Sequence, residues 1–415
     1  MKTPSQRFVR SWAITCVVLL AGVATVNAFV DPYLLFNMPR LKEFNQRKPG
    51  VETHERMMKA YEVLRAAPNG LILGTSRVAI GLDTAHASWP ARARPVYNLG
   101  LAGADPYTSF RYLQHVLSQR DVTVVVLGLD FEYFLSGKKR DPTAPMGFEA
   151  YLNVDRDGQA SPMRSWRTLR DWTEGTLSLE ALGDSIATVT STVRGQTLDV
   201  SPSGNLSEAG FRRETEEIGS APLFAQRNRY NIRTYRGRVF SQDGAAQADA
   251  PALADLRAIV ALCRARSIQL ELFIQPMHAD LLETLDLLGV WPAYETWKRE
   301  MVAVSHGPAR ADGAAVTRLW DFSDYDRFST ESLPADGDRR THLQWFWEPT
   351  HYTKALGDII LTRIFGGRDT GYGVTLTAET VDARLAAIRE HRKTYRERNP
   401  EAVRRVRAVY DSASP

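Results

Sequence analysis

"GLILGTSRVAIGLD", residues 70–83, predicts a buried strand that ends in a short polar turn. Residues 71–73 are an unbroken run of Leu, Ile and Leu, which is typical of a parallel strand covered on both faces. Gly74 interrupts the run, and Ser76 follows two positions later. Such a turn can be purely structural, can cradle a phosphate or can present a nucleophile. Motifs elsewhere in the sequence are needed to distinguish these three alternatives.

Four further apolar runs predict strands of the same kind. They are "PVYNLG" (95–100), "VTVVVLGLD" (122–130), "SIQLELFIQP" (267–276) and "VTRLWDFSD" (316–324). Amphipathic segments separate the runs, and two of them have proline near the expected helix start, at residues 105–120 and 251–267. Buried strands that alternate with amphipathic helices predict an α/β fold. We expect a three-layer α/β/α, doubly wound parallel sheet of the flavodoxin-like kind.

The first 30 residues predict a membrane-spanning helix. Lys2, Arg7 and Arg10 precede residues 11–30, which carry no charge and are long enough to cross a bilayer. Basic flanks of this kind stay in the cytoplasm. A cleaved signal peptide is the alternative, because "VNA" before Phe29 resembles a cleavage site. Either interpretation exports the remaining chain, and we expect a single-pass protein of the bacterial inner membrane with its main domain in the periplasm or otherwise outside the cytoplasm.

The alternation of strands and helices stops between about residues 137 and 250, a stretch far longer than an ordinary connection. We interpret this stretch as an inserted cap or subdomain. The arginine-rich end of the chain fits a solvated amphipathic helix, with contact to anionic lipid or an acidic polymer as the alternative. The predicted parts are a cytoplasmic stub with a transmembrane anchor (1–30), a juxtamembrane linker and helix (31–67), the α/β domain (68–366) and a basic helical tail (367–415).

The composition of the chain argues against a few kinds of ligand and site. A net charge of +4 and a pI near 9.0 are a mild excess for 415 residues and do not predict nucleic-acid binding. The two cysteines, Cys16 and Cys263, lie in an apolar segment and a helical pattern, which argues against a disulfide and against a cysteine-based metal site. The histidines show no metal-ligand spacing, and no cofactor fingerprint is present, so we expect neither a metal nor a cofactor.

Polar residues and glycines follow the predicted strands, where an open parallel sheet binds its ligands. A serine hydroxyl becomes nucleophilic when an imidazole removes its proton and a carboxylate orients that imidazole. "WFWEPTHYT" supplies both groups three residues apart, and glycines after the second strand allow main-chain amides to approach a developing oxyanion. The residues concerned are Ser76, Asn98, Gly100, Gly103, Asp130, Glu132, His278, Glu348 and His351.

Other interpretations of the serine turn fit less well. The glycine spacing of a dinucleotide site and the Gly-Lys-Ser/Thr of a P-loop are absent, and Val78 stands where a nucleophile elbow requires its second glycine. A literal "GDS" occurs at residues 183–185, but it lies in a helical pattern without a strand before it. Structural roles also remain open: capping for Ser76 and His351, a salt bridge for Glu348, a turn for Asp130, and ordinary packing for His278.

The pattern of these motifs resembles the SGNH (GDSL-type) hydrolase and acyltransferase superfamily. The likeness covers roughly residues 68–136 and 253–366: Gly-Thr-Ser after the first strand, Gly103 in "NLGLAGAD" and the carboxylate-x-x-His before the last helix. The chain is most similar to the membrane-anchored, exported branch. That branch includes alginate-acetylation proteins, DltD-like proteins and further anchored relatives that have "DPY" after the anchor and "HYT" near the end, as this chain does.

The resemblance implies a role for each matching residue. Ser76 would be the nucleophile, His351 the general base and Glu348 its supporting carboxylate, with the amides of Ser76 and Gly103 as oxyanion donors. The family's third-block Asn is missing, and "LGLDFEYF" has Asp130 there. An ionised carboxylate only accepts hydrogen bonds. Either Asn98 or Arg77 completes the oxyanion hole, or Asp130 is protonated, or activity is reduced or lost; His278 is a further candidate at this edge.

The resemblance also implies an activity and partners. We expect an acyltransferase or esterase that acts on O-acyl groups of a cell-envelope polymer or exopolysaccharide, with a multispanning membrane acyltransferase as a possible partner. The alternative is a catalytically degenerate scaffold that binds polysaccharide or that membrane partner.

Overall fold

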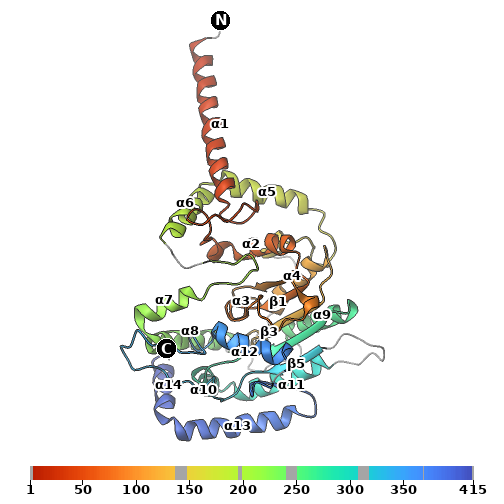
Figure 1. The fold of residues 1–415 in the computed structure, drawn as a ribbon, viewed down its shortest axis with the longest axis vertical. Helices are drawn as coiled ribbons and strands as arrows, with labels where there is room; N and C mark the ends of the chain where they lie inside the picture. Colours follow the sequence, from red (N-terminus) through yellow and green to blue (C-terminus); the bar gives the residue numbers. More distant parts are fainter. Residues whose placement is uncertain are drawn as a thin grey trace.

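The computed structural model has a mostly parallel β-sheet at its centre (Figure 1). It describes residues 3–135, 147–194, 199–239, 250–306, 317–367 and 369–413. Within these residues, six strands are hydrogen-bonded in the order β2-β1-β3-β4-β5-β6. They are β1 (Gly70–Gly74), β2 (Val96–Gly100), β3 (Val124–Leu129), β4 (Gln269–Ile274), β5 (Thr317–Asp321) and β6 (Val374–Thr375).

The five predicted strands are confirmed, and the sequence prediction missed β6. The first five strands run parallel, whereas β6 pairs antiparallel with β5 at the edge. β6 has only two residues, too few for an apolar run or an alternating pattern. The strand order reverses at β1, between β2 and β3, and such a switch point leaves a crevice at the carboxyl ends of the strands.

Helices cover both faces of the sheet, which gives three layers. Leu71 and Leu73 of β1 point into one apolar cluster, and Ile72 points into the other. Burial of each such side chain contributes about 1.5–3 kcal/mol relative to exposure to water. The first cluster is covered by α2 (Val51–Ala66), α4 (Pro106–Leu117), α9 (Pro251–Ala265), α10 (Ala279–Leu287) and α11 (Trp291–Ser305). The second is covered by α3 (Ser76–Gly81) and α12 (Lys354–Phe365).

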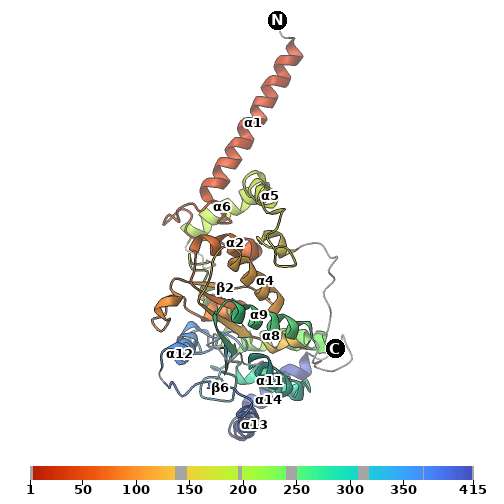
Figure 2. The ribbon, with the colours of Figure 1, turned by 90° about the vertical axis from the view of Figure 1, so that its right-hand side faces the viewer.

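The N-terminal helix α1 (Pro4–Val30) projects away from the rest of the structure (Figures 1 and 2). It is the one helix in the described part of the chain that is long and apolar enough to cross a membrane. A polar joint follows it. Asp31 accepts main-chain amides of the next turn, and Lys48 donates to the carbonyl oxygens of Val30 and Asp31 at 2.9 and 2.8 Å. These bonds satisfy the end of α1 and fix the direction in which it leaves the domain.

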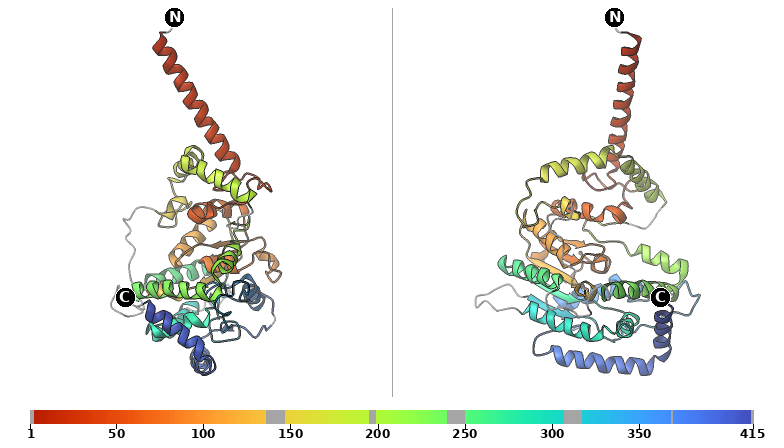
Figure 3. Two further views of the ribbon diagram at one scale, coloured as in Figure 1. Left: turned by 90° about the vertical axis from the view of Figure 1, so that its left-hand side faces the viewer. Right: turned by 180° about the vertical axis from the view of Figure 1, so that it is seen from behind.

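The predicted insertion occupies two places. The helices α5 (Arg164–Leu177) and α6 (Leu179–Val193) lie at the base of α1, whereas α7 (Ala209–Ile218) and α8 (Ser220–Val239) lie beside the domain (Figures 1 and 3). The predicted start of the insertion, near residue 137, falls outside the described residues. One inserted cap or subdomain was expected. The two helix pairs bury different surfaces, because α5 and α6 contact α1 and α8 contacts α10.

The segment predicted as a basic tail forms α13 (Val381–Arg398) and α14 (Pro400–Ser412), which pack on the domain. α13 buries Leu385 and Ile388 in the core. Arg384 donates to Asp321 and Asp324, which extends the fully buried pair between Lys298 and Asp321. Much of the tail's positive charge is therefore directed at acidic groups of the domain. Further arginine pairs with the domain include Arg389–Glu295, Arg392–Asp286, Arg396–Glu283, Arg396–Asp286 and Arg405–Asp280.

Candidate active site

Ser76 lies at the carboxyl edge of the sheet because of the turn that follows β1. Gly74 has a φ of +135°, which residues with a side chain rarely adopt, and a Cβ there would lie 3.2 Å from the carbonyl oxygen of Gly128. Thr75 is the N-cap of α3, where its side chain accepts from the amide of Arg77. Ser76 is therefore the first residue of α3, and the capping role considered for it belongs to Thr75.

His351 and Glu348 lie on one short loop before α12. Glu348 accepts the main-chain amides of His351 at 2.7 Å and of Thr350 at 3.2 Å. The amide of Trp347 donates to the carbonyl oxygen of His351 at 2.9 Å, which closes the loop. The N-cap of α12 is Thr353, so His351 has no capping role. The loop therefore holds the carboxylate and the imidazole in a fixed relation.

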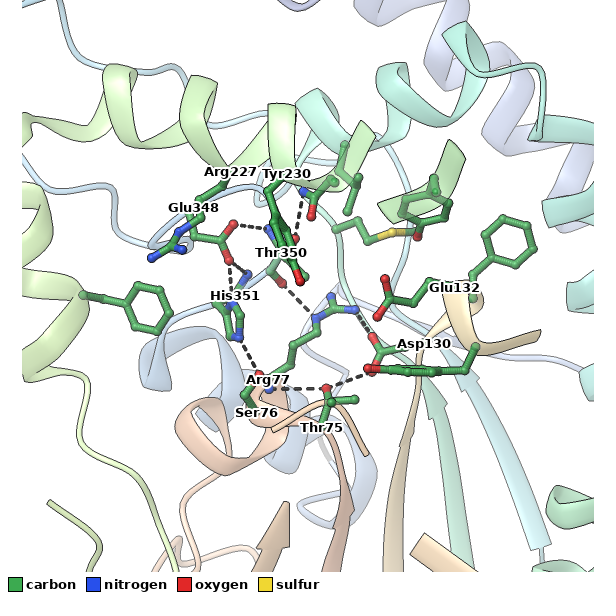
Figure 4. Close-up of a pocket in the computed structure, with 18 residues that line it drawn as sticks. Thr75, Ser76, Arg77, Asp130, Glu132, Arg227, Tyr230, Glu348, Thr350 and His351 are labelled. Atoms are coloured by element: carbon green, nitrogen blue, oxygen red, sulfur yellow. Dashed lines mark hydrogen bonds and ion pairs between the residues drawn. The ribbon is translucent and has the colours of Figure 1, made fainter. Parts of the chain in front are cut away.

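Ser76, His351 and Glu348 form one line of hydrogen bonds (Figure 4). Ser76 Oγ lies 2.8 Å from His351 Nε2, and His351 Nδ1 contacts Glu348 Oε1 directly. The carboxylate favours the tautomer with its proton on Nδ1, which leaves Nε2 free to accept the serine proton. Two predicted residues separated by most of the domain thus meet in the arrangement that activates a serine.

Glu348 is suited to remain ionised. Burial alone would raise its pKa, but the charge and hydrogen bond of His351, together with the amides of His351 and Thr350, lower that pKa below its ordinary value. Only 2% of the Glu348 side chain is exposed, compared with 20% for His351. The carboxylate is thus shielded from solvent, whereas the imidazole reaches an open cavity.

The cavity at this edge has a volume of about 290 Å³. Ser76, His351 and Gly103 line it, together with side chains of α7 and α8 that the sequence prediction missed. The ring of Phe211 lies 5.0 Å from the ring of His351, and Asn231 donates to the Thr350 hydroxyl at 3.2 Å. The other lining residues are Thr75, Arg77, Asp130, Phe131, Glu132, Tyr133, Arg227, Tyr230, Tyr235, Met277, Leu281, Glu348 and Thr350.

Gly103 lies in the cavity wall, at the edge where the resemblance expects an oxyanion donor. Its φ is +64°, and a Cβ would approach only the Tyr133 hydroxyl, at 3.8 Å. Ser76, as the first residue of α3, has an amide that a helix cannot pair internally. Main-chain amides are strong donors to a developing oxyanion. Both proposed amide donors therefore belong to residues that border the cavity.

The charged groups of Asp130 and Arg77 are both hydrogen-bonded to neighbouring residues. The Asp130 carboxylate accepts from Thr75 Oγ1 at 2.9 Å and from Gln275 Nε2 at 2.7 Å, and it forms an ion pair with Arg77. The guanidinium of Arg77 also donates to the carbonyl oxygens of Thr350, at 2.8 Å, and Pro276. Asp130 thus accepts hydrogen bonds from three neighbouring side chains and is not positioned as the missing donor. Each nitrogen of the Arg77 side chain already has an acceptor, which places Arg77 in a positioning role.

Asn98 and His278 do not belong to the cavity, contrary to the sequence prediction. Asn98 lies under α3, where its amide donates to the carbonyl oxygens of Val78 at 2.8 Å and Leu82 at 3.2 Å. His278 caps α10: its Nδ1 accepts the Asp280 amide and its Nε2 lies 2.9 Å from a main-chain oxygen. His278 follows β4 and Asn98 lies in the middle of β2, and both side chains point to other partners.

The literal "GDS" at residues 183–185 and the side chains that could bind a metal lie as follows. Ser185 of the literal "GDS" lies within α6, where its buried hydroxyl donates to Asn27 at 2.9 Å. It has no strand-end turn, as the sequence predicts. Within the described residues, no group of three or more His, Cys, Asp or Glu is placed to hold a metal ion.

Neither models of known protein families nor curated proteins match this chain.

Proposed function

We propose that this chain is a membrane-anchored, serine-dependent acyltransferase or esterase of the SGNH type. Its substrate would be an O-acyl group on a cell-envelope polymer or exopolysaccharide. The observation that carries the proposal is the line of hydrogen bonds from Ser76 through His351 to Glu348 at the wall of a cavity. The parallel sheet and the position of Ser76 after its first strand support an SGNH-type arrangement.

The reaction would have two steps. His351 Nε2 accepts the Ser76 proton as Oγ attacks the acyl carbonyl, and the amides of Ser76 and Gly103 stabilise the oxyanion. The ester C–O bond then breaks, and His351 returns the proton to the departing alcohol. In the second step a sugar hydroxyl or water gives its proton to His351, attacks the acyl-serine and releases Ser76. Glu348 stabilises the imidazolium in both steps.

Transfer is favoured over hydrolysis because the chain resembles anchored proteins that serve acetylation systems. A multispanning membrane acyltransferase would supply the acyl group in such a system. The apolar length of α1 supports a single membrane crossing, and Arg7 and Arg10 near its start would keep that end in the cytoplasm. The cavity would then lie in the periplasm or otherwise outside the cytoplasm.

A second candidate function is a catalytically degenerate scaffold that binds polysaccharide or a membrane acyltransferase. One observation favours it. Asp130 stands where the related pattern has an Asn donor, and it accepts hydrogen bonds from Thr75 and Gln275 instead. Loss of one oxyanion donor costs about 10²–10³-fold in rate. The scaffold and a slow enzyme therefore differ in whether Ser76 reacts at all.

Covalent labelling with a serine-directed fluorophosphonate separates the two candidates. We expect the full chain in detergent to be labelled, and Ser76→Ala and His351→Ala to abolish or strongly reduce labelling. Ser185→Ala is the matched control, since that buried serine should not react. Peptide mapping must place the label on Ser76. A folded full chain that stays unlabelled would contradict the enzymatic proposal and favour the scaffold.

A further inference from the structure

The helix α5 exposes its apolar side and turns polar groups toward the domain. Trp166, Leu169 and Leu177 are 63%, 54% and 43% exposed on its outer side. On the opposite side Asp171 is buried and accepts a hydrogen bond from the Tyr61 hydroxyl at 2.8 Å, and Gly175 packs on the joint that follows α1. A surface helix in water has the reverse pattern, with its apolar side on the core.

The helix α6 has the same inverted pattern. Leu179, Ile186 and Val193 recur every seventh residue and are 80%, 58% and 66% exposed. The buried side of the helix carries hydroxyl groups instead. Its buried polar residues are Ser185, Thr188, Ser191 and Thr192. The two helices contact each other, and we call their exposed apolar residues together the α5–α6 face. It comprises Met163, Trp166, Leu169, Trp172, Leu177, Leu179, Ile186 and Val193.

The α5–α6 face adjoins the end of the anchor. Asn27 of α1 donates to the carbonyl oxygens of Thr176 and Ser178 at 2.9 and 3.5 Å and accepts from Ser185 at 2.9 Å, so this buried amide fastens α1 to both helices. α5 runs crosswise to α1 at its base (Figures 1 and 3). The uncharged residues 11–30 of α1 cover about 30 Å, the thickness of the hydrocarbon core.

We propose that the α5–α6 face lies in the membrane interface, with its apolar side chains inserted among the lipids of the leaflet nearest the domain. The proposal rests on the membrane anchoring proposed for α1. Continuity with α1 identifies lipid as the occupant, because α1 ends its bilayer-length apolar run where α5 and α6 begin to contact it. Tryptophans such as Trp166 and Trp172 favour the lipid–water boundary. Two arginines of α5 fit this orientation. Arg164 stacks on the Tyr61 ring at 4.7 Å, and Arg170 pairs with Asp171 at the flank.

This arrangement would hold the domain against the bilayer by two attachments, the anchor and the α5–α6 face. Amphipathic helices of this kind bury their apolar side about 5–10 Å into the interface. With the joint at Asp31 and Lys48 also fixed, the cavity keeps one height and orientation above the lipid. A substrate or acyl donor at the membrane would then meet the site in a constant geometry.

The test measures the depth of single fluorescent labels in the full chain. We would attach an environment-sensitive dye to Leu169→Cys, Ile186→Cys, Val18→Cys and Glu390→Cys, each in a Cys16→Ser background. Burial raises the pKa of Cys263 to about 12, so that thiol stays unlabelled. The protein is reconstituted into nanodiscs of phosphatidylglycerol and phosphatidylethanolamine, with and without lipids that carry a doxyl quencher near the glycerol end of the acyl chain.

We expect blue-shifted emission and about a twofold or greater loss with the quencher at Leu169→Cys and Ile186→Cys. The dye at Glu390→Cys, on α13, should be unaffected, and Val18→Cys tests the anchor separately. The inference would be overturned if the dyes at Leu169→Cys and Ile186→Cys showed the emission of a water-exposed dye while the dye at Val18→Cys was shielded by lipid. The anchoring of α1 would then still hold. Shielding that appears only when a copurified membrane protein is present would also overturn the inference, because the occupant would then be that protein.

Discussion

Arg77 Nε donates to the carbonyl oxygen of Thr350 at 2.8 Å, so the residue after Ser76 holds the residue before His351. The same guanidinium pairs with Asp130 at the end of β3. One buried side chain thus connects the serine turn, the histidine loop and the neighbouring strand. The distance of 2.8 Å between Ser76 Oγ and His351 Nε2 depends on this connection as well as on Glu348.

Arg77→Ala should lower both stability and reactivity. Removal of one partner of a buried ion pair costs about 3–5 kcal/mol, because Asp130 keeps an unpaired charge. Denaturant unfolding measures this loss. The reaction of Ser76 with fluorophosphonate should slow, because the loop that carries His351 loses its bond to Arg77 and the histidine is displaced from the serine.

Arg77→Lys is the matched variant for the same position. A lysine can still pair with Asp130 but cannot reach three acceptors with a planar fork. It should recover stability more fully than reactivity. Equal recovery of both would show that Arg77 acts on stability alone and would contradict its positioning role.

Glu348→Gln should remove an acid-sensitive part of the stability. The pKa of Glu348 is lowered in the folded chain, so the unfolded chain binds the proton more readily. The ionised carboxylate therefore stabilises the fold above its ordinary pKa, and this contribution is lost as the pH falls through the folded pKa. Unfolding free energies of the wild type and Glu348→Gln should differ most near neutral pH and converge under acid conditions. A difference that is constant with pH would contradict this assignment.

Glu348→Gln should also slow the reaction of Ser76 with fluorophosphonate. Loss of the supporting carboxylate in a serine–histidine site costs up to about 10⁴-fold in rate, because the imidazole loses its correct tautomer. The fluorophosphonate reaction measures this effect near neutral pH. Unchanged labelling would mean that His351 is oriented by another group.

Gly357→Ala should increase the distance between Ser76 and His351, although Gly357 does not line the cavity. A Cβ at Gly357 would lie 1.7 Å from the carbonyl oxygen of Gly81, where α12 crosses α3. These helices begin next to His351 and at Ser76, so a wider crossing separates the two side chains. Overpacking of this kind costs about 1–3 kcal/mol. We expect a lower midpoint in denaturant and slower labelling of Ser76.

Gly237→Ala is the control for a helical glycine, because its Cβ would meet no atom within 4 Å. It should stabilise the chain by about 0.5–1 kcal/mol through helix propensity and leave labelling unchanged. If Gly357→Ala behaved like Gly237→Ala, the close crossing of α3 and α12 would not control the site.

The sequence was sufficient for the five parallel strands and for the reacting pair. Strands β1 to β5 are apolar runs of ordinary length, and parallel strands bring their carboxyl ends to one edge. That rule placed Ser76 correctly, and the carboxylate-x-x-His motif before the last helix identified His351. The rule failed for Asn98 and His278, because it does not give side-chain direction: Asn98 points under α3, and His278 caps α10.

Long-range packing accounts for the other features that were missed. Phe211, Tyr230 and Asn231 belong to helices whose sequence is polar and shows no motif, and they reach the cavity only through the position of α7 and α8. The arginines of α13 follow a pattern that is typical of a solvated helix. Their acidic partners, such as Glu283, are distant in the sequence and cannot be recognised without the fold.

Tyr230→Ala should separate the binding of a large substrate from the chemistry. Tyr230 is 66% exposed and lines the cavity from α8 (Figure 4). An exposed aromatic ring at a cavity mouth offers an apolar surface on which a sugar ring can stack. Its loss should raise KM for an acylated oligosaccharide and leave hydrolysis of a small aryl ester unchanged.

Tyr410→Ala is the comparison for this variant, because Tyr410 lies on α14 and stacks with Arg236 instead of lining the cavity. We expect it to leave KM for both substrates unchanged. Steady-state kinetics with the two substrates checks each expectation. If Tyr230→Ala slowed both reactions equally, Tyr230 would support the position of α8, and the substrate would have to bind elsewhere along the cavity. If it changed neither reaction, the wall formed by α8 would have no part in recognising the polymer.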